Sequence, residues 1–391
     1  MNNQTRFFYR FTIVHSFLIG LFPFYLPVFL WKQSYSFSDI SFFISWTGVG
    51  YLVALWFWNK QEIGNHPQRM IVGSFMLEII LLIGLFFSEI RPLLPLIGLL
   101  NGFYNCFFWI SNRILFLETI NQSDVGRKYG NFQIIVAIVL KMGILSGGLL
   151  LDDHGLTSIF IFSLFIVVTG LMFLFSSSMT GGQPLVSLNV SKFSLRQLLQ
   201  FKDNFRSKLV FSIDGLFLFL ESYFWILTLF LITHESFLKL GAVVIILMII
   251  FGFLFYFIKN SIDKMPVGLM YRISVGLYIL SWIFRGLITD KLGLPALLLL
   301  LVFISFFTSL FRLSFNKQFF EIARSTSRSQ YIMIKSYYSQ FFLAIQFFII
   351  GLLFYFTSSI QFSLNYLYLT SSIIALVYFF YRPFIPASIS N

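Results

Sequence analysis

The sequence predicts an all-α integral membrane protein with twelve transmembrane helices in two groups of six. The 391 residues are 58% hydrophobic and only 11% charged, whereas soluble globular proteins carry about 25% charged residues. The apolar residues form twelve runs, each near the roughly 20 residues that a helix needs to cross a bilayer. Lys and Arg gather in every second connection between these runs, as they do in cytoplasmic loops.

The first span follows Arg6 and Arg10 and resembles the start of a signal peptide. Its apolar run is too long for one, and no small-residue cleavage site follows it, so we interpret it as an uncleaved helix. Pro23 and Pro27 are expected to kink its outer half. The twelve predicted spans are 9–31, 39–58, 70–88, 93–117, 129–150, 156–178, 208–233, 237–258, 267–288, 293–315, 332–356 and 361–381.

The connection 179–207 is the one long, polar and basic loop, and it divides the chain midway. It predicts an N-terminal six-helix half (1–178), a cytoplasmic central loop (179–207) and a C-terminal six-helix half (208–391). With the N-terminus inside, seventeen Lys and Arg residues fall on the cytoplasmic side and four fall outside. This bias predicts that both termini are cytoplasmic, and it explains the net charge of +12 without nucleic-acid binding.

This topology resembles that of the major facilitator superfamily (MFS) of secondary transporters. "GILSGG" (Gly143 to Gly148) is similar to the superfamily's Gly-rich antiporter motif, although small residues at this spacing also serve plain helix packing. The loop "NKQEIGNHPQRM" keeps only Gly64 and Arg69 of the hallmark Gly-x-x-x-Asp-Arg-x-Gly-Arg-Arg pattern, and "KNSIDKMP" keeps less, so the subfamily stays open. The resemblance implies alternating access around a midplane site.

Three carboxylates inside predicted spans are candidates for proton coupling. Placing an ionisable side chain at bilayer depth costs free energy, so such a residue is expected to have a charged partner or a function. Glu221 lies near the middle of its span, and Asp214 lies two turns earlier on the same helix face. Glu78 is a single carboxylate in the third span. The alternative is a structural ion pair of Glu221 with Arg113, Arg285 or Lys141.

Polar groups at similar depth are candidates for the substrate cavity. This set comprises Lys141, Arg113, Asn105, Arg285, Gln346 and His15. Lys141 must pair with an acid or line the cavity, where it would bind an anionic group. Arg113 and Arg312 are long enough to snorkel towards the cytoplasm. For His15, packing between helices is favoured over a pH-sensing role.

Two cytoplasmic passages share a pattern of Asn, a cation, an apolar gap and a Glu. They are "NRILFLETINQSDVGRKYG" from Asn112 and "NKQFFEIARSTSRSQY" from Asn316. We interpret them as inner-gate latches. The gate candidates are Asn112, Glu118, Asn316, Lys317, Glu321 and Arg312.

Other chemistry has no motif in the sequence. There is no phosphate-binding Gly-rich loop, no Gly-x-Ser-x-Gly elbow and no Cys or His metal pattern, so we expect no enzyme, cofactor or metal. "DDHG" (Asp152 to Gly155) is interpreted as a solvated outer turn. Cys106 is the only cysteine and is expected to pack as a small hydrophobe.

The predicted function is proton-coupled transport of a small molecule, with the partial antiporter motif favouring efflux. Its partners would be the substrate, protons and membrane lipid, and a single chain would act as a monomer. Abundant Phe, Ile and Asn fit a multi-pass protein of a bacterial inner membrane. The alternatives are a polysaccharide-lipid flippase or a membrane enzyme of surface-glycan assembly, although the short outer loops disfavour the enzyme.

Overall fold

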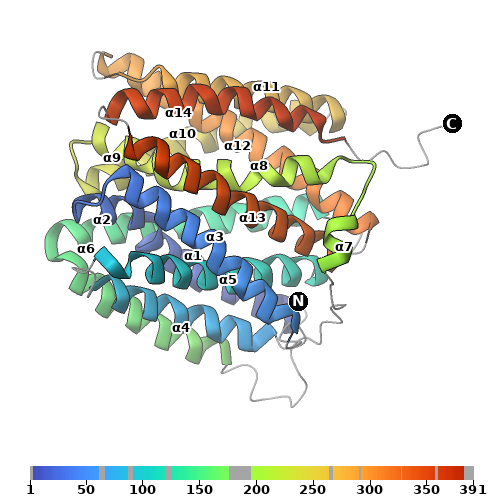
Figure 1. The fold of residues 1–391 in the computed structure, drawn as a ribbon, viewed down its shortest axis with the longest axis horizontal. Coiled ribbons are helices and arrows are strands. Elements are labelled where there is room, and N and C mark those ends of the chain that lie inside the picture. The colour runs from blue at the N-terminus through green and yellow to red at the C-terminus, as the bar shows by residue number, and fades with distance from the viewer. Residues whose placement is uncertain are drawn as a thin grey trace.

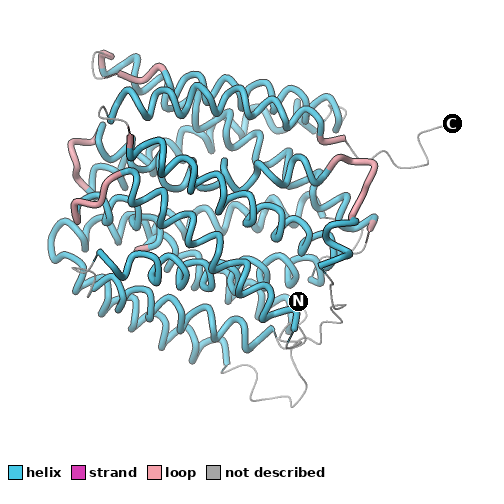
Figure 2. Tube along the Cα trace, in the orientation of Figure 1, coloured by secondary structure: helices cyan, strands magenta, loops and turns pink. Residues whose placement is uncertain are grey.

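The structure is a computed structural model that describes residues 3–60, 67–86, 91–119, 125–175, 195–263, 267–289, 292–326, 328–356 and 360–382. These residues are almost entirely helical, and no strand occurs among them (Figures 1 and 2). The long helices run roughly parallel or antiparallel to one another. This is the arrangement that a bilayer imposes, because each helix satisfies its backbone hydrogen bonds internally.

The helices begin and end as follows. They are α1 (Asn3–Leu21), η1 (Pro23–Tyr25), α2 (Leu26–Lys32), α3 (Phe37–Lys60), α4 (Pro67–Phe86), η3 (Arg91–Leu93), α5 (Leu94–Thr119), α6 (Val125–Phe175), α7 (Leu195–Gln200), α8 (Ser207–Phe219), η4 (Leu220–Phe224), α9 (Trp225–Ile232), α10 (Phe237–Asp263), α11 (Val267–Gly286), α12 (Leu294–Ser325), α13 (Arg328–Tyr355), α14 (Ile360–Ile374) and η5 (Ala375–Phe380).

Every predicted span overlaps a helix of the structure. Within the described residues, eight helices are long and apolar enough to cross a membrane, and Phe237–Ile250 and Leu364–Phe380 are shorter apolar helices. The 51-residue α6 covers the fifth and sixth predicted spans, with Gly155 at its kink. Gly155 has φ +71°, a backbone conformation that glycine adopts without steric cost.

The prolines act on the first span as expected. α1 ends at Leu21, the short η1 starts at Pro23, and α2 places Pro27 in its first turn. Proline removes a backbone donor and blocks the preceding helical hydrogen bond, so the chain is redirected here. The span therefore consists of two helical pieces rather than one straight rod.

The helices form two groups, which we name the N-terminal helices (α1 to α6) and the C-terminal helices (α8 to α14). Figure 1 shows them in different parts of the bundle, coloured blue to green and yellow-green to red. Within the groups α1 packs on α6, α3 on α5, α8 on α13, and α11 on α12. Between the groups α3 packs on α13 and α6 on α10. The start of α1, α7 and the end of η5 all lie at the right-hand end in Figure 1, which fits the prediction of both termini on one side.

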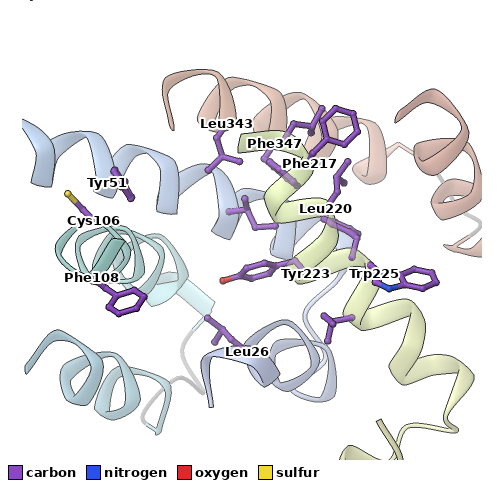
Figure 3. Packing of buried hydrophobic residues seen from close by; sticks show 14 of the residues in the cluster. Leu26, Tyr51, Cys106, Phe108, Phe217, Leu220, Tyr223, Trp225, Leu343 and Phe347 are labelled. Atoms are coloured by element: carbon purple, nitrogen blue, oxygen red, sulfur yellow. The ribbon is translucent and has the colours of Figure 1, made fainter. Parts of the chain in front are cut away.

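Aromatic side chains fill much of the space between helices. Figure 3 shows Tyr223 of η4 pointing towards α5, where Phe108 lies, and Phe217 and Phe347 belong to the same buried cluster. Cys106 is fully buried in this apolar region, as expected of a small hydrophobe. Small residues allow the closest approaches: a methyl group on Gly143 would collide with the backbone of α1 at Phe17. The "GILSGG" segment therefore serves helix packing in this structure.

At one end of the bundle the two groups are joined by hydrogen bonds to Asp152. Asp152, at the kink of α6, accepts hydrogen bonds from the Ser236 hydroxyl (3.0 Å) and from the backbone N–H groups of Phe237 (3.2 Å) and Leu238 (2.8 Å). The carboxylate thus caps the N-terminus of α10. Asp152, Asp153 and His154 are all exposed, which agrees with the interpretation of "DDHG" as a solvated turn, and Asp152 has this capping role in addition. The Tyr25 hydroxyl lies 2.7 Å from the Ile144 carbonyl of its own group and 3.4 Å from the Phe237 carbonyl of α10.

Candidate functional site

The candidate site starts from two carboxylates on one helical face. Asp214 lies on α8, and Glu221 lies on η4, a five-residue π-helical segment that follows α8 directly. Asp214 is fully buried, and the Glu221 side chain is 15% exposed. A π-helical turn is a frequent feature of functional sites because it offsets the side chains after it.

Arg312 of α12 joins the two carboxylates. Its Nη1 lies 2.9 Å from Asp214 Oδ1, and its Nε lies 3.0 Å from Glu221 Oε2. Both are charge-assisted hydrogen bonds, which are shorter and stronger than neutral ones. The expectation that Arg312 snorkels to the cytoplasm was wrong, because its guanidinium points into the bundle and is only 18% exposed.

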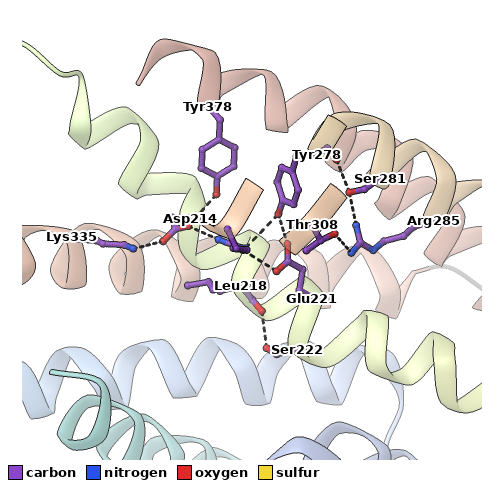
Figure 4. A network of polar contacts seen from close by, with 11 residues as sticks. Asp214, Leu218, Glu221, Ser222, Tyr278, Ser281, Arg285, Thr308, Lys335 and Tyr378 are labelled. Carbon is purple, nitrogen blue, oxygen red and sulfur yellow. Dashed lines mark hydrogen bonds and ion pairs between the residues drawn. The ribbon is translucent and has the colours of Figure 1, made fainter. Parts of the chain in front are cut away.

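Lys335 and two tyrosines complete the network in Figure 4. Lys335 Nζ of α13 forms an ion pair with Asp214 Oδ2 at 3.1 Å. Tyr278 of α11 donates to Glu221 Oε1 at 2.5 Å, and Tyr378 of η5 donates to Asp214 Oδ1 at 3.2 Å. All four carboxylate oxygens therefore have a partner, and six helical elements meet at one polar centre. We name Asp214, Glu221, Arg312 and Lys335 the ion cluster.

Such a cluster is expensive to keep. Each ion loses several kcal/mol of hydration on burial, and pairing seldom recovers more than that, so apolar side chains would often be as stable. Ionisable groups at bilayer depth are also rare outside pathways for ions and substrates. The ion cluster is therefore better explained by a function than by stability.

Arg285 of α11 lies nearby but has another environment. Its Nη1 and Nη2 donate to the hydroxyls of Ser281 and Thr308, both at 2.9 Å. Its guanidinium stacks on the Trp282 and Trp225 rings, 4.3 and 4.8 Å from their centroids. No carboxylate of the described residues forms an ion pair with it. The alternative that Arg285, Arg113 or Lys141 is the ion-pair partner of Glu221 was wrong, since that partner is Arg312.

The N-terminal helices contribute neutral polar groups. Asn105 donates to the Asn101 backbone and side-chain oxygens at 2.8 and 3.1 Å. Asn101 in turn donates to Thr47 at 3.1 Å and to the Tyr223 hydroxyl at 3.2 Å. These hydrogen bonds connect Asn105 of α5, through Asn101, to Tyr223 of η4. Glu221 lies on the same segment, η4.

His15 and Glu78 are separated from the ion cluster. His15 is fully buried, and its ring stacks 4.0 Å from the Phe108 ring and 5.5 Å from the Tyr104 ring. Neither of its nitrogens has a hydrogen-bond partner among the described residues, and the same holds for both Glu78 oxygens. The packing alternative for His15 fits this environment better than a place in an open cavity.

The remaining candidates lie as follows. Lys141 is half-buried on α6 and forms no ion pair with a described residue, and Gln346 donates to the Ser212 carbonyl at 3.3 Å. Of the gate candidates, Asn112 is buried, Asn316 is half-buried and Lys317 is exposed. Glu321 interacts electrostatically with Lys317 and Arg324 of its own helix rather than across helices. The Glu118 side chain and Gly64 lie outside the described residues.

Sequence reasoning missed Lys335, Tyr278 and Tyr378. Lys335 stands close to the predicted start of its span at residue 332, where a cation is ordinarily a membrane anchor. α13 begins at Arg328, seven residues before Lys335, so Lys335 lies about two turns inside the helix. A prediction that started the helix at Arg328 would have singled it out. The two tyrosines are among 18 in the chain and carry no local signal.

Comparison with known proteins bears on the fold. No protein-family model and no curated protein matches the sequence. Among solved structures, the nucleoside transporter NupG is 16% identical with a TM-score of 0.68, covering 97% of this chain and 98% of that one. A point mutant of NupG gives 14% identity and a TM-score of 0.71 with the same coverage. The POT family transporter PepTSo is 12% identical with a TM-score of 0.68, again at 97% and 98% coverage.

The chain therefore has the fold of these transporters along nearly its whole length. At this level of identity the likeness concerns the fold alone. The predicted MFS-like architecture is confirmed to that extent, and the subfamily stays unresolved. These neighbours are transporters rather than enzymes.

Proposed function

We propose that the protein is a secondary active transporter of a small molecule and works by alternating access. The observation that carries the proposal is the buried ion cluster, which lies inside a bundle with a transporter fold and has partly exposed groups in Glu221 and Arg312. A fixed midplane site between two helix groups that rock against each other is the arrangement that such transporters use.

The proposed moving parts are residues 1–178 and 208–391, joined by the loop 179–207. They correspond to the N-terminal and C-terminal helices, which pack within themselves and meet through α3–α13 and α6–α10. We propose twelve crossings with both termini cytoplasmic, in a bacterial inner membrane. The Lys and Arg distribution supports this orientation.

Protons are the proposed coupling ion, and Glu221 is the proposed carrier. Its carboxylate is the more exposed of the two, whereas Asp214 has no exposed surface. Protonation of Glu221 would weaken its ion pair with Arg312 and leave Arg312 on Asp214 alone. A change in one proton would thereby redistribute contacts among α8, η4 and α12, which is what coupling requires.

The test uses inside-out vesicles from cells that express the protein, Glu221→Gln, Glu235→Gln or no transporter. Glu235 is an exposed carboxylate at the other end of the same span and serves as a matched control. A pH gradient, acidic inside, is imposed and the accumulated metabolites are profiled by mass spectrometry. Gradient-dependent accumulation by the wild type and the control, lost in Glu221→Gln, is the expected result for proton-driven export.

Unchanged accumulation in Glu221→Gln would remove Glu221 from the coupling mechanism. Identical profiles in all four vesicle preparations would count against proton-driven export altogether. The direction of export rests only on the partial antiporter motif, and its packing role in the structure weakens that support.

A lipid-linked sugar is the second candidate substrate. Arg285 favours it, since this buried cation without a described carboxylate partner would suit a pyrophosphate group. Flipping of a fluorescent lipid-linked sugar in proteoliposomes, with no accumulation of soluble metabolites in the vesicle assay, would favour the flippase over the transporter.

A further inference from the structure

Arg113 is a cation of the N-terminal helices that faces the ion cluster across the interface. It lies on α5, which packs against α13, and it interacts electrostatically with Asp214, Lys335 and Tyr51. Its side chain is half-buried, and its guanidinium carbon lies 6.0 Å from the Trp109 ring centre. The described residues give it no hydrogen bond and no ion pair.

The carboxylates of the ion cluster have no free position for Arg113. Asp214 Oδ1 accepts from Arg312 and Tyr378, and its Oδ2 pairs with Lys335. Glu221 Oε1 and Oε2 are taken by Tyr278 and Arg312. Arg113 therefore lies near two carboxylates whose oxygens already accept hydrogen bonds or ion pairs from other side chains.

The charges in this region do not balance. Four described cations, Arg113, Arg285, Arg312 and Lys335, stand against the two carboxylates Asp214 and Glu221. Arginine stays charged in proteins, so it cannot escape the imbalance by losing a proton. An uncompensated positive charge in a low-dielectric interior costs free energy, and a bound anion is the direct way to neutralise it.

We infer that the transported substrate is an organic anion, a carboxylate or a phosphate, and that it binds between Arg113 on one helix group and the Lys335–Arg312 pair on the other. This inference rests on the proposed transport function and names the substrate class of the same site. Guanidinium groups present paired N–H donors that match the oxygens of both anions. The Tyr51 hydroxyl of α3 interacts with Arg113 and with Ser336 of α13, and so lies at the same interface between the helix groups.

The same geometry couples binding to movement. Without an anion, Asp214 attracts Arg113, but Lys335 and Arg312 repel it, and the oxygens of Asp214 already have partners. This repulsion opposes the approach of α5 to α12 and α13. An anion placed between them turns the repulsion into two attractions, and so favours closure around the substrate. A ligand shifts a conformational equilibrium only by such a difference in interaction between the two states.

The experiment measures thermal unfolding of the purified full-length protein in detergent at constant ionic strength. Benzoate is compared with benzamide, and glucose 6-phosphate with glucose, so that each pair differs chiefly in charge. Inorganic phosphate and citrate extend the two anion classes. We expect at least one anion to raise the Tm in a saturable way while its neutral counterpart does not, and the responding pair identifies carboxylate or phosphate.

Variants separate this site from general anion effects. Arg113→Gln should weaken the responding anion roughly 10- to 100-fold, because hydrogen bonds to charged groups contribute about 1.5–3 kcal/mol. Arg113→Lys should keep part of the affinity, and it keeps the charge if Arg113→Gln folds poorly. Arg272→Gln removes an exposed arginine of α11 and should leave the response unchanged.

Either of two outcomes would overturn the inference. One is that no anion stabilises the wild type more than its neutral partner does. The other is that Arg113→Gln and Arg272→Gln respond to the anion equally. The vesicle assay distinguishes this failure from that of the proposed function. Accumulation of a neutral compound such as a nucleoside would keep transport and reject the anion, whereas anion binding without accumulation would do the reverse.

Discussion

The two helix groups solve the burial of polar side chains in different ways. In the C-terminal helices, every oxygen of Asp214 and Glu221 meets a cation or a tyrosine hydroxyl. In the N-terminal helices, His15 and Glu78 are buried without a hydrogen-bond partner among the described residues, and aromatic rings surround His15. The first arrangement is a connected network that can rearrange when one charge changes, whereas the second is a packing environment. The comparison assigns the response to protons to the C-terminal helices, whereas the N-terminal helices contribute Arg113 to the proposed substrate site.

Substitution of Arg312, the cation that contacts both carboxylates, is expected to have the largest effect and tests the comparison most directly. Arg312→Gln leaves Asp214 and Glu221 without the group that joins them, and breaking a buried ion pair costs about 3–5 kcal/mol. We expect loss of transport and a large drop in Tm, with partial recovery in Arg312→Lys. Transport in vesicles and thermal unfolding in detergent measure the two effects. Normal transport by Arg312→Gln would show that the ion cluster is not part of the mechanism.

A methyl group on Gly143 tests whether packing dominates in the N-terminal helices. The added carbon would collide with the Phe17 backbone of α1, and overpacking costs about 1–3 kcal/mol. Gly276→Ala is the matched control, because nothing lies within 4 Å of its added carbon. Thermal unfolding should show a lower Tm for Gly143→Ala and an equal or higher one for Gly276→Ala. Equal behaviour of the two variants would contradict the close α1–α6 contact.

Two tyrosine substitutions sharpen the comparison within the C-terminal network. Tyr278→Phe removes the 2.5 Å hydrogen bond to Glu221, and Tyr378→Phe removes the 3.2 Å hydrogen bond to Asp214. A lost hydrogen bond to a charged group is worth about 1.5–3 kcal/mol, so each change should lower stability. Only Tyr278→Phe should also shift the pH dependence of transport, because Glu221 is the proposed proton carrier. A shift in Tyr378→Phe alone would move that role to Asp214.

The smallest effect is expected from His15→Phe. A phenyl ring suits the surrounding aromatic residues and removes two nitrogens that have no partner, which should change stability by about 1 kcal/mol or less, in the favourable direction. Transport should stay near the wild-type rate. Abolished transport in a variant that folds normally would mean that the N-terminal helices also hold responsive chemistry, and the comparison would fail.

The sequence was most informative where the signal is local. Apolar runs predicted the helical spans, and an acid within such a run singled out Asp214 and Glu221. Partners were harder to predict, since Arg312 lies 98 and 91 residues from the two carboxylates that it joins. Its position near a predicted cytoplasmic end suggested snorkelling, and Lys335 was overlooked for the same reason. The direction of a long side chain depends on the neighbouring helix, which the sequence does not reveal.

The same limit applies to Asp152. The segment "DDHG" predicted a solvated turn, and Asp152 is exposed. The sequence did not reveal its capping role, because the hydrogen-bond donors are 84 to 86 residues away at the start of α10. Gly155 and the kink of α6 place the carboxylate there. Recognition of this role would have required the fold itself.

The cap at Asp152 also has a consequence for the equilibrium between conformations. The carboxylate belongs to one helix group and the capped helix to the other, so separating the groups at this end exposes three donors at once. Loss of a helix cap costs about 0.5–2 kcal/mol, and each 1.4 kcal/mol changes an equilibrium constant tenfold. Asp152 therefore stabilises the conformations in which the two helix groups are in contact at this end. Asp152→Ala should populate states open at this end more often, and distances between spin labels on α2 and α9 would report the change.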